Sequence, residues 1–273
     1  MPEFFAPDGA RIHYTDDGVG MPVLALAGLT RNGSDFDYVA PQFSAKRFIR
    51  MDYRGRGSSQ WSGAETYTIP NEAADVLALL DHLKLDQVAI LGTSRGGLIA
   101  LLLAVLAKDR LSGVCFVDIG PELGSAGLDT IKDYIGKNPS QKTYDEAVEM
   151  RSKLLAGFEN VPESRWREEV ERHYIENENG LEINYDPALR DAVIAAGTQP
   201  IPDLWPLFDA LDGLPLALIR GANSDLLSIE TRDEMVRRRP DMIQADIPDR
   251  GHVPFLDEPT SKEVLNAWLK LLP

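Results

Sequence analysis

The feature that most constrains the fold is a short stretch, LGTSRGGL, at residues 91–98. It places Ser94 between two glycines, with the apolar segment QVAIL before it and GLIALLLAVLA after it. The first segment has the length of a buried strand and the second that of a buried helix. We therefore expect a sharp strand-to-helix turn with Ser94 at its apex in a strained backbone conformation. Gly92 and Gly96 are expected because a Cβ at either position would collide as strand and helix close.

Extended and helical patterns alternate along most of the chain, which is typical of a doubly wound α/β sheet. Several extended segments are apolar throughout, as expected of parallel strands that are buried on both faces. The expected strands are residues 10–14, 23–27, 48–52, 87–91, 113–118, 216–219 and 243–247. The expected crossover helices are residues 71–83, 95–107, 230–239 and 261–272.

The alternation stops between residues 120 and 202. Two segments there, 144–158 and 164–175, have apolar residues at helical spacing and many charges, and no strand candidate is found. We expect residues 1–119 and 203–273 to form the core and residues 120–202 to form a helical lid insertion. Because the insertion follows a strand directly, it should lie over the carboxyl ends of the strands, where open α/β sheets bind ligands. The alternative is that its helices only cover one face of the sheet.

Composition excludes several classes of protein. The longest apolar stretch, residues 98–107, is about half of the roughly twenty residues needed to span a bilayer, and the N-terminus has no signal-peptide pattern. We expect a cytoplasmic protein with no membrane partner. With 43 acidic and 28 basic side chains, the net charge of −15 would repel nucleic acid, so no nucleic-acid partner is expected. Cys115 lies within the apolar run VCFV and is expected to be a structural thiol.

A serine hydroxyl becomes a nucleophile when a base takes its proton and a third group holds that base. The chain offers four histidines. His13 lies in an expected strand, and His82 and His173 lie in expected helices, so these three are interpreted as packing or surface residues. His252 lies in the loop DRGHVPFLDEP after the last expected strand, and we expect it to be the base for Ser94.

Two aspartates compete to orient His252. Asp225 follows the penultimate strand in LIRGANSDLLS, and Asp118 ends the preceding strand in VCFVDIG. We favour Asp225, which would hold the imidazole in one tautomer and stabilise its charged form. The alternative role for Asp225 is that of a turn or helix-capping residue, and Asp118 would then be the partner of the imidazole.

The negative charge that develops on a substrate oxygen needs two preorganised N–H donors. We expect the backbone N–H of Arg95 and that of Leu29, with Gly28 permitting the turn after the strand PVLALAG. The Arg95 side chain either adds a positive charge beside Ser94 or pairs with a neighbouring carboxylate, and we favour the pairing.

The chain resembles the α/β-hydrolase superfamily, of the lid-bearing type that includes carboxylesterases, enol-lactonases, meta-cleavage-product hydrolases, epoxide hydrolases and haloalkane dehalogenases. The resemblance rests on LALAGLTRNG, MDYRGRGSS, LGTSRGGL, RGANSDLLS and DRGHVPFLDEP, with the family's order Ser, Asp, His. Ala27 and Gly28 stand where the family commonly has His-Gly. The histidine side chain that would support the loop is therefore absent, but the backbone N–H donor is kept. The resemblance implies an α/β-hydrolase fold, with a mostly parallel twisted sheet, helices on both faces and a helical lid.

The resemblance also limits the reactions that are expected of this chain. Epoxide hydrolases and haloalkane dehalogenases have an aspartate where this chain has Ser94, so we expect instead a serine hydrolase that cleaves a small ester or lactone through an acyl-enzyme. Two alternatives stay open, a C–C bond hydrolase acting on a vinylogous diketone and a ligand receptor without turnover. No cofactor or metal is expected, because the histidines are scattered. The candidate pocket residues, which as aromatics more often belong to a core, are Phe158, Trp166, Trp205 and Phe208.

Overall fold

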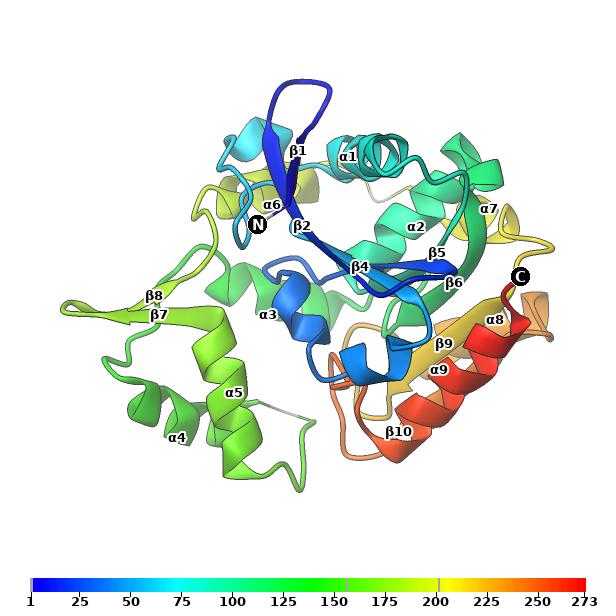
Figure 1. The fold of residues 1–273 in the computed structure, drawn as a ribbon. Coiled ribbons are helices and arrows are strands. Elements are labelled where there is room, and N and C mark those ends of the chain that lie inside the picture. Colours follow the sequence, from blue (N-terminus) through cyan, green and yellow to red (C-terminus); the bar gives the residue numbers. More distant parts are fainter. Residues whose placement is uncertain (1, 156, 201) are drawn as a thin grey trace.

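A twisted, mostly parallel sheet forms the centre of the protein in a computed structural model that describes residues 2–155, 157–200 and 202–273 (Figure 1). Its strand order is β1-β2-β4-β3-β5-β6-β9-β10. The pairs β1–β2 and β2–β4 are antiparallel and the others are parallel. The strands are β1 (Glu3–Phe5), β2 (Arg11–Asp17), β3 (Pro22–Leu26), β4 (Arg47–Met51), β5 (Val88–Thr93), β6 (Leu111–Val117), β9 (Leu216–Gly221) and β10 (Ile243–Ile247).

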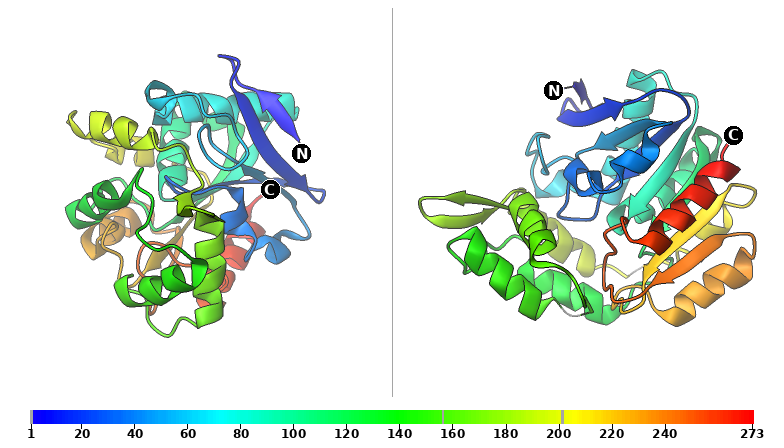
Figure 2. Two further views of the ribbon diagram at one scale, coloured as in Figure 1. Left: turned by 90° about the vertical axis from the view of Figure 1, so that its left-hand side faces the viewer. Right: turned by 60° about the horizontal axis from the view of Figure 1, so that its bottom comes forward.

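Helices cover both faces of this sheet (Figures 1 and 2). Alternate side chains of a strand point to opposite faces, so Ile90 and Leu91 of β5 enter two separate apolar cores. The core around Ile90 includes side chains of α1 (Ile69–His82), α2 (Arg95–Leu106), α7 (Trp205–Asp209) and α8 (Ile229–Arg238). The core around Leu91 includes side chains of α9 (Pro259–Leu271) and of the short 3₁₀ helices η1 (Gly33–Phe36) and η2 (Ala40–Phe43).

The strands and crossover helices expected from the sequence are present, with ends that differ by a few residues. Every residue of β5, β6 and β9 is buried, which explains why these strands are apolar throughout. Strand β1 was not predicted, because a segment of three residues is too short to show a period. The predicted α/β-hydrolase fold is therefore confirmed.

The segment between β6 and α7 contains both helices and strands. Its elements are α3 (Ser125–Tyr134), α4 (Tyr144–Leu154), α5 (Glu163–His173), β7 (Tyr174–Asn177), β8 (Gly180–Ile183) and α6 (Leu189–Gly197). Residue 156, in the helix expected over 144–158, and residue 201, near the expected boundary, lie outside the described residues.

The expectation that this segment holds no strand is wrong, because β7 and β8 form an antiparallel hairpin. The hairpin turns at Glu178-Asn179, where the Asn179 N–H donates to Asn177 Oδ1 at 2.8 Å, and Gly180, the first residue of β8, has φ 121°. An Asn-Gly pair is a hairpin signal, and here it comes at the end of β7, which begins directly after α5 ends at His173. Ile175, expected in that helix, therefore lies in β7.

The segment lies to one side of the core, beyond the carboxyl ends of several strands (Figures 1 and 2). Its contacts with the core include loops that follow β3, β4, β9 and β10. Among them are the hydrogen bonds Arg31 Nη2 to Glu169 at 2.9 Å, Asp186 N to Gly55 O at 2.8 Å, Asn223 Nδ2 to Gly157 O at 3.0 Å and Glu159 N to Asp249 O at 3.1 Å, and the ion pair of Arg165 with Asp257. Among the described residues, none of the helices combines the length and the apolar character needed to cross a membrane.

Candidate active site

Ser94 occupies the turn between β5 and α2 and is buried, with 8% of its surface exposed. Its backbone has φ 49° and ψ −112°, so the strained conformation expected from the sequence is present. An ideal Cβ on Gly92 would lie 2.7 Å from backbone atoms of Gly96 and Gly97. A Cβ on Gly96 would overlap the carbonyl oxygen of Leu26 on β3. Both glycines are therefore required for the close approach of strand and helix.

The serine lies at one end of a chain of hydrogen bonds. Ser94 Oγ is 3.0 Å from His252 Nε2, and His252 Nδ1 is 2.8 Å from Asp118 Oδ2. Because a carboxylate can only accept, Nδ1 carries the proton and Nε2 is the acceptor that faces the serine hydroxyl. The other carboxylate oxygen, Asp118 Oδ1, accepts the Gly221 N–H at 2.8 Å, and Asp118 is completely buried. An imidazole held in this way can take a proton from Ser94.

The structure corrects the choice between the two aspartates. Asp118 follows β6, the strand next to β5, and it contacts the imidazole, whereas Asp225 is exposed and lies four residues beyond the end of β9. Both ring nitrogens of His252 are already bonded, to Ser94 and Asp118, which leaves no nitrogen for Asp225. The favoured Asp225 is therefore wrong as the partner of His252, and the competing Asp118 takes that position.

The two expected oxyanion donors belong to segments that lie next to the serine. Arg95 follows Ser94 as the first residue of α2. Gly28 lies against the serine, since an ideal Cβ on Gly28 would be 3.9 Å from Ser94 Cβ and 3.3 Å from Arg31 Cγ. Leu29 follows Gly28 on this loop, which we call the oxyanion loop (residues 27–31). The placement is that expected of residues whose N–H groups serve one oxyanion, and that role remains a prediction.

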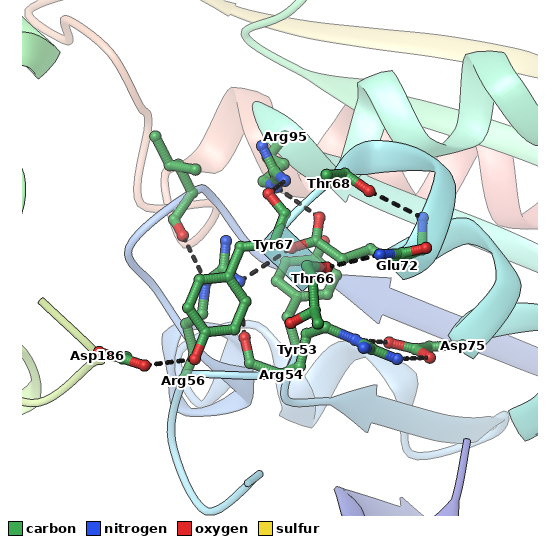
Figure 3. A network of polar contacts seen from close by, with 12 residues as sticks. Tyr53, Arg54, Arg56, Thr66, Tyr67, Thr68, Glu72, Asp75, Arg95 and Asp186 are labelled. Carbon is green, nitrogen blue, oxygen red and sulfur yellow. Dashed lines mark hydrogen bonds and ion pairs between the residues drawn. The ribbon is translucent and has the colours of Figure 1, made fainter. Parts of the chain in front are cut away.

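A buried ion-pair network connects the oxyanion loop to the start of α2 (Figure 3). Glu72 on α1, with no exposed surface, accepts hydrogen bonds from Arg56 Nη1 at 2.9 Å and from Arg95 Nε. Arg56 Nε donates to the Leu29 carbonyl oxygen at 2.9 Å. Burial lowers the pKa of Arg56, Glu72 counteracts that shift, and the rings of Tyr53 and Tyr67 lie 5.5 and 5.4 Å from the guanidinium. The Arg95 side chain thus pairs with a carboxylate, the interpretation favoured from the sequence.

The candidate pocket aromatics fall into two groups. Phe208 is fully buried in the core beneath the sheet, 6.2 Å from the Phe116 ring. The ring of Trp205 meets that of Phe208 edge to face and lies beneath Arg238. Phe208 therefore belongs to the core, and Trp205 packs against it.

Phe158 and Trp166 belong to the insertion. Their rings are 5.8 Å apart, and they lie 5.6 and 6.1 Å from the ring of Phe255, three residues after His252. They pack the insertion onto the histidine loop, and a role in lining a substrate site stays a prediction for these two.

The other histidines and the cysteine make packing contacts. His13 Nδ1 is 2.9 Å from Asp52 Oδ2, and His82 Nε2 is 3.3 Å from the Tyr14 hydroxyl. Burial raises the pKa of the Cys115 thiol far above its ordinary value. Within the described ranges, no group of three or more His, Cys, Asp or Glu side chains is arranged to hold a metal ion.

Sequence reasoning missed the ion-pair network and the charged contacts of Arg31. A signal for the network exists in α1, where Glu72 and Asp75 fall among the buried positions Ala73 and Val76. A carboxylate at a buried helical position needs a cationic partner. The arginines of MDYRGRGSS are the arginines that most closely precede α1, and Arg54 and Arg56 do fill these positions.

The fold and this site together define an α/β hydrolase. The model of the Alpha/beta hydrolase family matches residues 23–262, and the chain belongs to this family. A crystal structure of an alpha/beta hydrolase from Novosphingobium aromaticivorans is similar with a TM-score of 0.92 and 31% identity, covering 99% of this chain and 98% of that one.

Two relatives of known name are similar over most of their length. A 3-hydroxybutyrate-oligomer hydrolase from Cupriavidus necator is 35% identical over 261 residues, covering 90% of this chain and 88% of the relative. A 2-(acetamidomethylene)succinate hydrolase from Mesorhizobium japonicum is 24% identical over 260 residues, covering 94% and 89%.

Proposed function

We propose that the protein is a serine hydrolase of carboxylic esters, with Ser94 as nucleophile, His252 as general base and Asp118 as the carboxylate that orients the imidazole. The observation that carries the proposal is the pair of hydrogen bonds at His252, 3.0 Å to Ser94 Oγ and 2.8 Å to Asp118 Oδ2. The buried position and strained backbone of Ser94 support it, since strain of this kind is concentrated at functional sites.

The reaction proceeds in two halves. Ser94 Oγ attacks the ester carbonyl carbon while His252 Nε2 takes the hydroxyl proton, and the carbonyl oxygen becomes an oxyanion. The bond to the alcohol oxygen then breaks, and His252 returns the proton to the leaving alcohol. A water molecule attacks the acyl-enzyme, gives its proton to His252, and the acid leaves as the Ser94 hydroxyl is restored.

The oxyanion is stabilised by the backbone N–H groups of Leu29 and Arg95, on segments that lie next to Ser94. Residues 120–202 act as a lid that covers the reacting groups and contacts the remote parts of the substrate. The contacts of this segment with loops after β3, β4 and β10 support that role.

The substrates that we propose are short esters of hydroxy acids. The basis is the relative from Cupriavidus necator, which is a 3-hydroxybutyrate-oligomer hydrolase, is 35% identical and matches this chain over nearly its whole length. Such oligomers are chains of ester bonds that end in a free carboxylate. Each cleavage would release a hydroxy acid and a shorter oligomer.

The test compares the wild-type protein with Ser94→Ala on p-nitrophenyl butyrate, a 3-hydroxybutyrate dimer, a lactone and an aryl vinylogous diketone. We expect hydrolysis of the first two by the wild-type protein and its loss in Ser94→Ala. Ser112→Ala is the matched control, because Ser112 is a serine of similar burial, 7% exposed, in β6. Ester turnover that survives in Ser94→Ala contradicts the mechanism, and cleavage of the diketone alone contradicts the substrate class.

A further inference from the structure

A charged cluster joins the oxyanion loop to the insertion. The Arg31 guanidinium donates to Asp35, to Glu169 Oε2 at 2.9 Å and to His173 Nδ1 at 3.0 Å. Glu169 and His173 lie on α5, whereas Arg31 ends the oxyanion loop, whose Gly28 lies against Ser94. The cluster therefore begins beside the nucleophile and continues into the insertion.

Arg151 on α4 interacts at longer range with this cluster, and its guanidinium has no ion-pair partner among the described residues. Its Nε is buried without a hydrogen bond, and no carboxylate among the described residues lies within ion-pair distance of its guanidinium. Its charge interacts at longer range with Arg31, Glu169, Tyr134 and Tyr174, and burial together with the Arg31 charge lowers the pKa of Arg151. The guanidinium remains charged at neutral pH.

Glu169, the carboxylate that interacts with Arg151 at longer range, is already bound. Its Oε2 accepts from Arg31 and its Oε1 accepts from the Tyr38 hydroxyl at 3.2 Å. Arg151 as a whole is intermediate in exposure, whereas its Nε is buried without a hydrogen bond. A buried unsatisfied polar atom in a native structure calls for an explanation, such as a ligand or an ion. An anion beside the Arg151 guanidinium would supply the missing partner.

The groups that act electrostatically on Arg151 include Arg31, which belongs to the oxyanion loop. The Tyr134 hydroxyl, which interacts with the charge of Arg151, also approaches the side chain of Thr30. Thr30 lies between Leu29 and Arg31 on the oxyanion loop. The oxyanion loop therefore connects the surroundings of Ser94 with those of Arg151.

We propose that Arg151, assisted by the Tyr134 hydroxyl, binds a carboxylate of the substrate, so that the enzyme prefers esters that carry a free acid a few bonds from the cleaved carbonyl. This inference rests on the proposed function. A guanidinium matches a carboxylate in shape and donates two parallel hydrogen bonds to it. An oligomer of 3-hydroxybutyrate meets the requirement, because its terminal carboxylate is separated from the last ester carbonyl by a short chain.

The test measures binding to the Ser94→Ala protein by calorimetry, with a 3-hydroxybutyrate dimer and with its carboxamide. The two ligands differ in one charge, and we expect the acid to bind on the order of ten- to a hundredfold more tightly. Adding Arg151→Gln should abolish the difference between acid and amide. Adding Arg167→Gln, the matched control, should keep it, because Arg167 pairs with the exposed Asp145 on the outer side of the insertion.

Equal binding of acid and amide to the Ser94→Ala protein overturns the inference, as does a preference for the acid that survives Arg151→Gln. If Arg151→Gln fails to fold by circular dichroism, Arg151→Lys keeps the charge but loses the bidentate guanidinium, so it should lose part or all of the preference, and full retention of the preference decides against a guanidinium site. Binding is measured without turnover, so a failure of the proposed ester hydrolysis would be recognised separately, by the wild-type protein binding these acids without cleaving them.

Discussion

The Arg56 guanidinium donates a hydrogen bond to the backbone carbonyl oxygen of Leu29, over a distance of 2.9 Å. The same guanidinium binds Glu72, which also binds Arg95 (Figure 3). The two residues whose N–H groups we assign to the oxyanion are thus tied to one buried carboxylate. Because oxyanion donors must be preorganised, a shift of either residue should act on the transition state more than on substrate binding.

We predict that Glu72→Gln lowers kcat by up to about 100-fold with a smaller change in KM, since an error of about 1 Å in position can cost that much. Affinity for a trifluoromethyl ketone, which forms an oxyanion on the serine, should fall in parallel. Steady-state kinetics and inhibition constants measure both effects.

Asp75→Asn provides the control for Glu72→Gln. Asp75 is equally buried on α1 and binds Arg54 at 2.6 and 2.8 Å, but it contacts neither Leu29 nor Arg95. This substitution should lower the free energy of unfolding and leave kcat of the folded protein near the wild-type value. Equal losses of kcat in the two variants would show that Glu72 acts through general stability.

The position of Asp118 makes a second prediction. Asp118→Asn should lower kcat by about 10⁴-fold, by analogy with the same change in a serine protease, because an amide at this position favours the wrong imidazole tautomer. Asp225→Asn should leave kcat almost unchanged, since Asp225 is exposed and is not bonded to His252. The kcat of both variants is measured on one ester. A large loss in Asp225→Asn together with little loss in Asp118→Asn would mean that His252 changes its partner during the reaction.

Much of the site could be predicted because it is encoded locally. The strand, turn and helix around Ser94 are contiguous, and His252 follows the last strand of the sheet. The choice between Asp118 and Asp225 could not be made from the local sequence. Both follow strands, and only the course of the loop after β9 directs Asp225 to the solvent.

The contacts that the sequence did not predict join separate segments. Glu72 meets Arg56 from a different loop and Arg95 from a different helix, so no spacing along the chain encodes the pairing. The β7–β8 hairpin was missed for another reason, because an apolar residue at Ile175 extends the helical pattern of α5 past the residue where the helix ends. At these positions, tertiary contacts and the turn sequence determined the structure, and the local hydrophobic periodicity did not.

The glycines of the elbow make a third prediction. Gly96→Ala should destabilise the protein by about 3 kcal/mol or more, because the added Cβ meets the backbone of Leu26, which cannot move without shifting β3. Gly197→Ala at the end of α6 is the control, since nothing lies within 4 Å of the added Cβ and alanine favours a helix. Urea unfolding measures both, and a Gly96→Ala protein as stable as wild type would mean that strand and helix can separate.

The last prediction concerns His173 and pH. Arg31 can only donate, so His173 Nδ1 is the acceptor of their 3.0 Å hydrogen bond, and a second proton would have to enter at that bonded nitrogen. Burial, reinforced by the charges of Arg31, Arg151 and Arg172, lowers the pKa of His173 well below its ordinary value of 6.5.

Below about pH 6.5 the unfolded chain therefore binds a proton that the native protein does not bind. The free energy of unfolding should fall with pH in this range, by up to about 1.4 kcal/mol per pH unit from this residue. In His173→Gln that contribution is absent, so urea unfolding at pH 7.5, 6.5 and 5.5 should give a smaller decrease than in the wild-type protein. His82→Gln, at an exposed histidine on α1 outside the charged cluster, is the control. An identical decrease in the wild-type and His173→Gln proteins would contradict a neutral, buried His173 at the junction of the oxyanion loop and the insertion.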